Sequence, residues 1–425
     1  MKWMESDPQH RRILHNWQIF ALVIAVLGEL FLAGDWYGFA AVIPFVSKDL
    51  HLNAGEAGFA QGAFAITYSL GMFVWSPVGR RLAARWLFAV GLIGTGLFMA
   101  LQAGVHDYST LILYRLLIGF FDAAVWVATM KLIVGWFPMH RHGATMGILL
   151  AAFSLAITLD FAVGIPVSGA FGWRYFFLGL GCLTILVGLI GLAAIKGGLR
   201  DVGFADFSWN DGRATHDRHA PLSLVFRSKW LYVGGLAIFG DTFALAATAT
   251  WVVPAFITIQ GMPPASGATI GTLMGLSQIV FLLIGGWLSD RMRRTLMLQI
   301  GAFLAILSAV TFVAAVSWAM PWGMLLAIAA FSGVAVFSGG AIFSLISEKY
   351  GEELGATAIG FAELGGILST LIAPWLLGVV IDATHSFTTA FVVFTLVEVA
   401  ILVFLLIAAR DSLAERQAAH SGATR

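Results

Sequence analysis

Long apolar runs recur along the whole chain, and short polar stretches separate them. Each run approaches the roughly 20 residues that a helix needs to cross a bilayer. The runs are continuous rather than alternating, which favours helices over the strands of a membrane barrel. The pattern therefore predicts twelve transmembrane helices, at residues 17–46, 54–78, 86–104, 109–135, 143–169, 175–195, 230–259, 266–288, 295–317, 321–346, 355–381 and 387–409.

Composition supports this pattern. Of the 425 residues, 59% are hydrophobic and 11% are charged, and the mean hydropathy is +0.89. A soluble domain usually carries about 25% charged residues. We therefore expect an all-α membrane protein whose surroundings are the lipid bilayer. The amino-terminal tail is polar and the apolar run after it is long, so no cleavable signal peptide is expected.

Several functional classes lack their sequence features. The single cysteine, Cys182, excludes an intrachain disulfide and a cysteine-based metal cluster. The net charge of +1 comes without a basic stripe interleaved with aromatic residues, so no nucleic-acid partner is expected. Neither G-x-x-x-x-G-K-[ST], nor H-E-x-x-H, nor a nucleophile elbow occurs, which argues against an ATP-driven pump and an enzyme. We expect no cofactor and no metal site.

Basic residues predict the orientation. The loops that follow even-numbered spans, with the two tails, hold most of them, including Arg80, Arg81, Arg85, Arg141, Arg291, Arg293 and Arg294. The opposite loops hold only Lys48 and Arg174. Because basic residues accumulate on the cytoplasmic side, both termini are predicted to be cytoplasmic, in an inner membrane of the bacterial type.

The chain also repeats itself in two halves. HRHGATMG (140–147) recurs as EELGATAIG (352–360), and SPVGRRLAAR (76–85) aligns with GGWLSDRMRR (285–294). The polar stretch 196–229 separates the halves, which predicts six-helix bundles at 1–195 and 230–425 with a cytoplasmic linker between them. The linker residues His216, Asp217 and His219 could also bind a metal, but a solvated linker is the preferred interpretation. A 6+6 repeat is typical of secondary transporters, with the site between the halves, and favours alternating access over a channel.

Two ions interrupt the apolar fourth span. Arg115 and Asp122 are seven residues apart, almost two helical turns, so their side chains share one face. A charged side chain at membrane depth costs roughly 2.5–3.5 kcal/mol on insertion scales. Such groups usually face a watery cavity or a partner and mark a transport path. We therefore expect the site to be organised around this face.

These features resemble the major facilitator superfamily over essentially the whole chain. GGWLSDRMRR (285–294) is similar to the family's cytoplasmic signature G-x-x-x-D-R-x-G-R-R, which implies gating roles for Asp290, Arg291 and Arg294. In the amino-terminal copy Gly79 replaces the aspartate. The chain looks most like the anion:cation symporter branch, through the region from Asp35 to FAAVIPFVSKDLHL, WFPMHRHGATMG (136–147), FGWRYFFLG (171–179) and the Arg115–Asp122 spacing.

This branch imports organic anions with protons, and two positions depart from its pattern. Trp36 stands where the branch often has an arginine, which removes one positive charge that could bind an anion. His140 replaces the usual glutamate.

The resemblance implies a central cavity lined by the first, fourth, seventh and tenth spans. The proton-coupling candidates are Asp35, Asp122 and Glu29. The candidate solute-binding residues are Arg115, Asp241, Tyr37, Tyr68, Trp126, Trp251, Gln278 and Ser338. Lipid-facing positions are the alternative for the aromatic residues, and helix packing is the alternative for Ser338.

Other buried acids are expected to be less central. Asp160, Glu363 and Glu398 lie in spans away from the cavity, and Glu363, near the cytoplasmic start of its span, is expected to be structural. Lys131 can extend to the cytoplasmic interface and is expected to be an anchor.

The coupling hypothesis joins Asp35 to Arg115. Counting residues from the outer ends of their spans places the two at similar depth, with Asp122 nearer the midplane. Glu29 and Asp35 are about 120° apart around their helix and need not act together. If the solute binds Arg115, a nearby carboxylate loses its counter-charge and takes a proton more readily, so proton and anion bind cooperatively. The alternative is a permanent ion pair that braces the helices.

The sequence thus predicts a proton-coupled transporter, acting as a monomer, that imports a small organic anion. Intramembrane acids outnumber bases, so a proton-coupled exporter of cationic or amphipathic compounds is the alternative. DFAVGIPVSG (160–169) matches the exporter signature G-x-x-x-G-P-x-x-G-G only in part. A sensor on the same fold is a third class. The sequence leaves open the solute, the direction, proton against sodium coupling, and the oligomeric state.

Overall fold

The computed structural model describes residues 8–138, 141–196, 202, 223–289 and 291–410. Almost all of them are helical, and twelve helical stretches are long and apolar enough to cross a membrane. The predicted all-α class with twelve transmembrane helices is therefore confirmed. The stretches are Arg12–Leu50, Ala54–Arg81, Ala84–Gly104, Tyr108–Trp136, Thr145–Phe171, Trp173–Ala194, Lys229–Ile259, Pro264–Ser289, Arg294–Ser317, Trp322–Gly351, Thr357–Thr384 and Phe387–Ala408.

The first six spans form the amino-terminal bundle. Its helices are α2 (Pro8–Leu50), α3 (Ala54–Gly62), α4 (Phe64–Arg81), α5 (Ala84–Leu101), α6 (Tyr108–Trp136), α7 (His142–Leu159), α8 (Ile165–Phe171) and α9 (Trp173–Ala194). α3 and α4 together make the second span, and a π-helical segment, Asp160–Gly164, joins α7 to α8 in the fifth. Asn53 and Glu56 form a capping box that begins α3. Asp107 begins α6, and hydrogen bonds from the Thr110 backbone and side chain lower the pKa of its carboxyl.

The last six spans form the carboxy-terminal bundle. Its helices are α10 (Ser223–Arg227), α11 (Lys229–Ile259), α12 (Pro264–Ser289), α13 (Arg294–Ser317), α14 (Trp322–Phe331), α15 (Gly339–Thr384) and α16 (Phe387–Ala408). α15 belongs to two spans, because Gly351, at φ 69°, bends the chain between them. The tenth span is broken near its middle, where a 3₁₀ segment, Ser332–Val336, separates α14 from α15. Such breaks can mark ion or solute sites in transporters.

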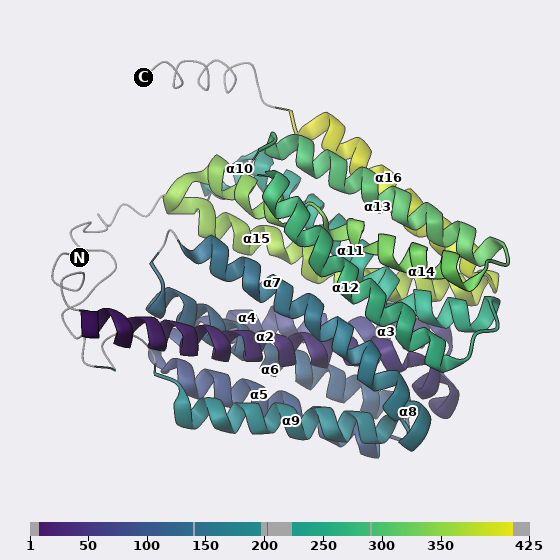
Figure 1. The fold of residues 1–425 in the computed structure, drawn as a ribbon, viewed down its shortest axis with the longest axis horizontal. Coiled ribbons are helices and arrows are strands. Elements are labelled where there is room, and N and C mark those ends of the chain that lie inside the picture. The colour runs from purple at the N-terminus through teal and green to yellow at the C-terminus, as the bar shows by residue number, and fades with distance from the viewer. Residues whose placement is uncertain (1–7, 139–140, 197–201, 203–222, 290, 411–425) are drawn as a thin grey trace.

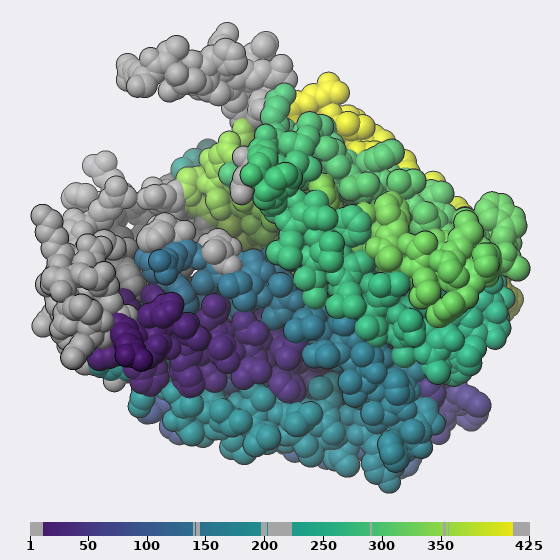
Figure 2. Space-filling view, in the orientation of Figure 1, coloured from purple at the N-terminus to yellow at the C-terminus, as the bar shows by residue number. Residues whose placement is uncertain are grey.

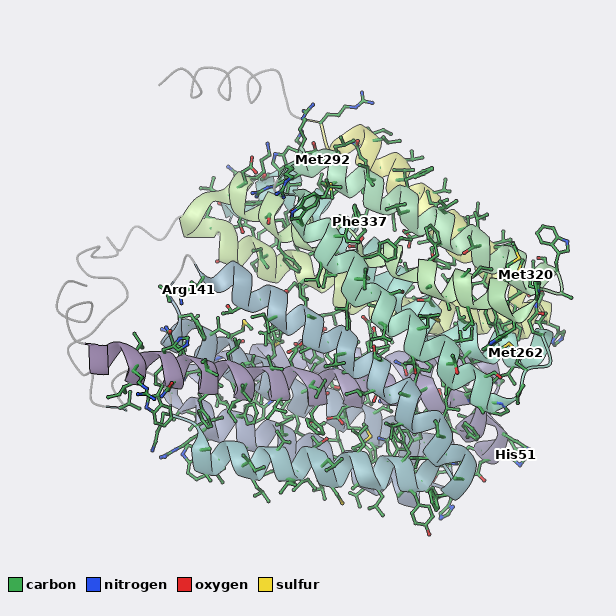
Figure 3. All side chains as sticks on the ribbon, in the orientation of Figure 1. His51, Arg141, Met262, Met292, Met320 and Phe337 are labelled. Carbon is green, nitrogen blue, oxygen red and sulfur yellow. The ribbon has the colours of Figure 1, made fainter. Side chains whose placement is uncertain are left out.

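The two bundles lie side by side (Figure 1). The purple-to-teal helices of the first half occupy one side of the molecule and the green-to-yellow helices of the second half the other, and Figure 2 shows the halves meeting across the visible face. Arg141 and Met292 lie toward the end of the molecule where α2 begins and α16 ends, whereas His51, Met262 and Met320 lie at the opposite end, called here the far end (Figure 3).

Most of the predicted linker, 196–229, falls outside the described residues, and so do His216, Asp217 and His219. The described outer surface of the bundles is rich in exposed large apolar side chains, including Phe73 (71% exposed) and Ile407 (68%). This surface suits contact with lipid, because burying an apolar side chain away from hydrocarbon brings no gain in free energy.

Candidate functional site

Asp122 is the centre of a buried polar network in the amino-terminal bundle. Its Oδ2 accepts a hydrogen bond from Trp36 Nε1 in α2 at 2.9 Å, and its Oδ1 accepts one from Thr95 Oγ1 in α5 at 2.7 Å. The Asp122 side chain is completely buried. An indole can only donate, whereas a hydroxyl can also accept. A proton on this carboxyl is therefore best placed on Oδ1, where the Thr95 hydroxyl can turn to accept it.

Arg115 lies on the same helix and is also completely buried, but its partners are backbone carbonyls. It donates hydrogen bonds from Nε to Ala60 (2.9 Å), from Nη1 to Asp35 (2.9 Å), and from Nη2 to Gln61 (2.7 Å) and Trp36 (3.3 Å). The hypothesis of an ion pair with the Asp35 carboxylate was therefore wrong in this conformation, because the guanidinium contacts the main chain of that residue. Arg115 ties α6 to α2 and α3.

Two aromatic rings complete the surroundings of this guanidinium. The carbon at its centre lies 5.1 Å from the ring centroid of Phe39 and 5.0 Å from that of Phe64. Ring faces and carbonyl oxygens both carry negative charge density, so they stabilise a buried cation without a carboxylate partner. The positive charge still acts on its neighbours, because Arg115 interacts electrostatically with Asp122 and Asp35.

The Asp35 carboxyl accepts a long hydrogen bond, 3.4 Å, from the Thr184 hydroxyl of α9, and its Oδ2 has no partner. Asp160, in the π-helical segment, interacts electrostatically with Asp35 and also has an unpartnered oxygen. Asp35 thus has polar neighbours in the fifth and sixth spans, although its charge also acts on Asp122.

Two further acids, one from each bundle, are linked electrostatically to this network. Glu29 of α2 is 4% exposed and interacts electrostatically with Asp122 and with Glu363 of α15. Tyr68 of α4 interacts with all three acids, and its ring meets the Trp36 ring edge-on at 4.9 Å. The structure therefore brings Glu363, which was expected to be structural, next to the central cluster. We call Glu29, Trp36, Tyr68, Asp122 and Glu363 the acidic cluster.

The carboxy-terminal bundle contributes a separate polar contact. Ser338, in the turn before α15, donates a hydrogen bond to the Asp241 carboxylate of α11, at 2.8 and 3.1 Å from its two oxygens. Gln278 of α12 is buried, and its side-chain oxygen has no partner. Trp251 donates to the Pro374 carbonyl at 3.0 Å and so ties α11 to α15.

The two remaining aromatic candidates, Tyr37 and Trp126, pack against apolar residues. Tyr37 is completely buried and packs edge-on against Phe153 at 5.6 Å. Trp126 is partly buried on α6 and packs against the apolar core.

Of the predicted gating residues, Asp290 lies outside the described residues. Arg294 pairs with Glu348 at 3.3 Å and donates to the Ser344 carbonyl, which ties the start of α13 to α15. Arg291 lies over the ring of Trp287, in the last turn of α12, at 4.0 Å.

The amino-terminal copy of this motif uses a different arrangement. Lys131 donates to the carbonyls of Gly79 and Leu82, at 2.5 and 2.6 Å, at the carboxyl end of α4. A cation there suits the helix dipole. A Cβ on Gly79 would lie 2.6 Å from the Val127 side chain, so an aspartate here would require Val127 to shift.

Contacts at the far end join the two bundles closely. The Asp382 carboxylate of α15 accepts hydrogen bonds from the backbone N–H groups of Ala54 (2.9 Å) and Gly55 (2.6 Å), at the start of α3. A Cβ built on Gly58 would lie 2.1 Å from the Pro374 carbonyl oxygen. α7 and its π-helical extension pack similarly against α12. We call the α3–α15 contact the far-end closure.

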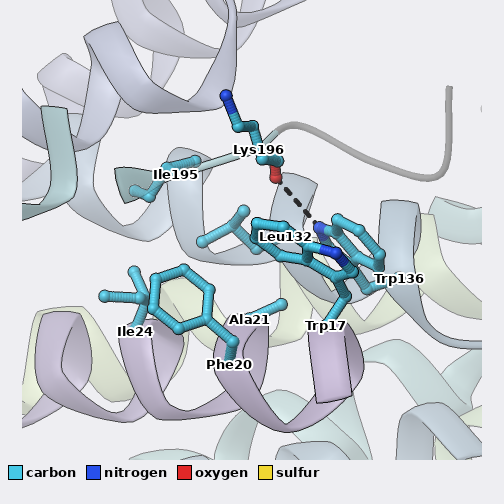
Figure 4. A pocket seen from close by; sticks show the side chains of 8 residues that line it. All are labelled: Trp17, Phe20, Ala21, Ile24, Leu132, Trp136, Ile195 and Lys196. Carbon is cyan, nitrogen blue, oxygen red and sulfur yellow. Dashed lines mark hydrogen bonds between the residues drawn. The ribbon is translucent and has the colours of Figure 1, made fainter. Parts of the chain in front are cut away.

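A small crevice at the opposite end of the amino-terminal bundle does not have the features of a solute site. Figure 4 shows its lining residues from α2, α6 and the end of α9. The rings of Trp17 and Trp136 stack at 5.9 Å, and Trp136 donates to the Lys196 carbonyl at 3.0 Å. These contacts fasten the start of the linker to the bundle.

Asp122 could be identified from the sequence, but its hydrogen-bond partners Trp36 and Thr95 could not. Trp36 was noted only as a lost positive charge, and Thr95 carries no sequence signal that separates it from other apolar-span threonines. Glu363 had one usable signal, an acid within a long apolar run.

A family model described as Major Facilitator Superfamily matches residues 25–353 and 234–424. A probable L-galactonate transporter of Escherichia coli is 23% identical over 84% of each chain. The membrane sensor protein UhpC of the same species is 22% identical over 90% of this chain and 89% of its own. A bacterial homologue of the human lysosomal transporter Spinster, solved in an inward-facing, occupied conformation, superposes with a TM-score of 0.73 at 15% identity, covering 94% of this chain and 98% of that one.

Proposed function

Because the chain belongs to the Major Facilitator Superfamily, we propose that it imports a small organic anion, of the sugar-acid class, together with a proton by alternating access. The solute class is suggested by the relative named as a probable L-galactonate transporter, which aligns over most of both chains. The observation that carries the coupling is the acidic cluster, in which Asp122 is held by donors from two other spans and Glu29 interacts with both Asp122 and Glu363.

The cluster supplies a physical reason for coupling. Arg115, the buried base nearest to it, has its donors engaged with carbonyls. A carboxylate solute that approaches an ionised acid to about 5 Å meets a repulsion of about 3 kcal/mol at an effective dielectric constant near 20. Protonation of the acids removes this repulsion, so the proton raises the affinity for the anion, and by linkage the anion raises the affinity for the proton.

In this proposal Asp122 carries the transported proton on Oδ1, and Glu29 and Asp35 are further proton-coupling candidates. Tyr68 and Trp36, whose rings meet edge-on beside Asp122, are the proposed packing surface for a polyol chain. Arg115 favours the anion through its charge, and direct binding would require it to leave its carbonyl partners. Asp241, Tyr37, Trp126, Trp251, Gln278 and Ser338 remain proposed solute contacts.

We further propose that both termini are cytoplasmic, in an inner membrane, and that a monomer is the transporting unit. The distribution of basic loop residues supports this orientation. The far-end closure would then seal the outer side, and the conformation would be inward-facing.

Reconstituted protein tests the proposal directly. Uptake of L-galactonate into proteoliposomes should follow an imposed pH gradient, acidic outside, and should not need sodium. Asp122→Asn should abolish driven uptake and leave counterflow exchange of the same solute. Asp107→Asn is the matched control, because asparagine caps a helix as well as aspartate and Asp107 is exposed. Undiminished driven uptake by Asp122→Asn would reject Asp122 as the coupling site.

The same acidic cluster favours one alternative, a proton-coupled exporter of cationic or amphipathic compounds, because acids could bind a cation directly. Accumulation of an organic cation under the opposite gradient, with no response to any sugar acid, would select that function. Binding of a sugar acid without transport would select a sensor.

A further inference from the structure

The carboxy-terminal bundle contains a second pair of acids, and the proposed mechanism gives no role to one of them, Glu398. Glu398 of α16 is 1% exposed, and both of its carboxyl oxygens lack a hydrogen-bond partner. It shares a small crevice with Asp241 and interacts with it electrostatically. The crevice lies between α11, α13, α16 and the turn before α15, and its lining residues are Ala237, Gly240, Asp241, Leu298, Ala302, Ser338, Glu398, Ile401 and Leu405. Of these lining residues only Asp241 and Glu398 titrate.

The two acids have opposite surroundings. Asp241 accepts a hydrogen bond from the Ser338 hydroxyl and lies near the amino-terminal end of α15, because a Cβ built on Gly339 would lie 3.9 Å from its Oδ2. A helix amino terminus and a hydroxyl donor both favour a negative charge. Asp241 is therefore better suited than Glu398 to carry a negative charge.

Glu398 has no such support. Apart from Asp241 and Ser338, the crevice is lined by aliphatic residues and glycine, and a Cβ built on Gly240 would lie 3.4 Å from Glu398 Oε2. A buried carboxylate without a partner costs several kcal/mol, and the charge of Asp241 adds repulsion. The Glu398 carboxyl therefore requires a neutralising cation. The crevice has no room for a water molecule, which favours the smallest cation.

We propose that Glu398, Asp241 and Ser338 form a second cation site, within the carboxy-terminal bundle, that holds a proton on Glu398. The site lies beside the break in the tenth span, where Ser338 links the start of α15 to Asp241. A movement of α15 that withdraws Ser338 would leave Asp241 without its donor and let it take the proton from Glu398. The presence of a proton on Glu398 does not depend on the proposed function, and only the role of this site in transport rests on it.

Infrared spectroscopy of the purified protein tests occupancy without any transport assay. A protonated carboxyl in an apolar site gives a carbonyl band separate from those of ionised carboxylates. Wild-type protein at neutral pH should show such a band that Glu398→Gln lacks. Glu56→Gln is the matched control and should leave the band unchanged, because Glu56 caps an exposed helix start and glutamine can replace it there. If Glu398→Gln does not fold, Ser338→Ala should instead shift the frequency of the protonated-carboxyl band, because Asp241 loses its donor and takes the proton from Glu398.

Sodium is distinguished in the same preparation. The melting temperature of the wild-type protein is compared in sodium chloride and in choline chloride at equal ionic strength. If it is higher in sodium chloride, and Glu398→Gln abolishes this difference, the cation is sodium and the proton assignment is overturned. Unchanged protonated-carboxyl bands in Glu398→Gln would also overturn it. For the transport role, Glu398→Gln should lower the number of protons moved per solute by one. Loss of all sugar-acid transport in the wild type would reject the proposed function but leave the infrared result intact.

Discussion

Replacing Asp382 should open the far-end closure. The Asp382 carboxylate accepts hydrogen bonds from two N–H groups at the start of α3, at 2.9 and 2.6 Å, and these join the two bundles. Hydrogen bonds to a charged acceptor contribute about 1.5–3 kcal/mol each. Because the contacts are partly buried, solvent reduces this value, and we take about 2 kcal/mol for the pair. Asp382→Ala should therefore shift the balance toward separated far ends by roughly thirtyfold.

Distance measurements between spin labels give the populations. A Cys182→Ser background removes the single native thiol. Cysteines in place of Ser109 and Met324 put one label on each bundle, because both residues are exposed near the far-end starts of α6 and α14. The parent should show one short distance, and Asp382→Ala should add a longer one.

The control is Glu56→Gln, which alters the same helix start but not the contact between bundles. If Asp382→Ala keeps the single short distance while remaining folded, the hydrogen bonds do not govern the closure. A distribution that broadens equally in Glu56→Gln would mean that fraying of α3, rather than loss of the link, causes the change.

Two further substitutions test the amino-terminal bundle. Trp36→Phe keeps an aromatic ring but removes the hydrogen-bond donor to Asp122 Oδ2, so the ionised form of this buried carboxyl loses about 1–3 kcal/mol of stabilisation. Asp122 then keeps its proton to higher pH, and driven uptake should persist to higher pH. An unchanged pH profile would contradict the role of this bond. Arg115→Lys replaces five guanidinium donors by three ammonium donors that cannot reach the same carbonyls. The melting temperature of this variant without solute should fall by several degrees. A variant that melts normally but loses only solute affinity would instead indicate direct anion binding.

The sequence was sufficient for the fold because the decisive signal is local. Each span is a run of apolar residues whose length the bilayer sets, so the twelve helices could be counted without knowing how they pack. The breaks within spans could not be predicted in the same way. The π-helical segment at Asp160–Gly164 and the 3₁₀ segment at Ser332–Val336 arise where neighbouring helices press closely on the chain, as Gly333 does against α12.

From the sequence, only those site residues could be predicted that stand out by themselves as charges within an apolar span. Charges at Arg115 and Asp122 stand out in any apolar run, but their partners depend on packing. Carbonyl groups satisfy Arg115, and no sequence pattern distinguishes a carbonyl partner from a carboxylate. Glu363 is adjacent to Glu29 only because the two bundles meet there, a long-range relation that residue spacing within one span does not contain.

The far-end closure brings main chain against main chain. A Cβ on Gly58 would lie 2.1 Å from the Pro374 carbonyl oxygen, and one on Gly378 would lie 2.3 Å from the Ala54 carbonyl oxygen. Glycine has no rotamers to immobilise, so this contact forms and separates with little change in side-chain entropy. Little conformational freedom is therefore lost when the far ends join, so the few hydrogen bonds of Asp382 are enough to hold them together, and breaking those bonds is enough to let them part.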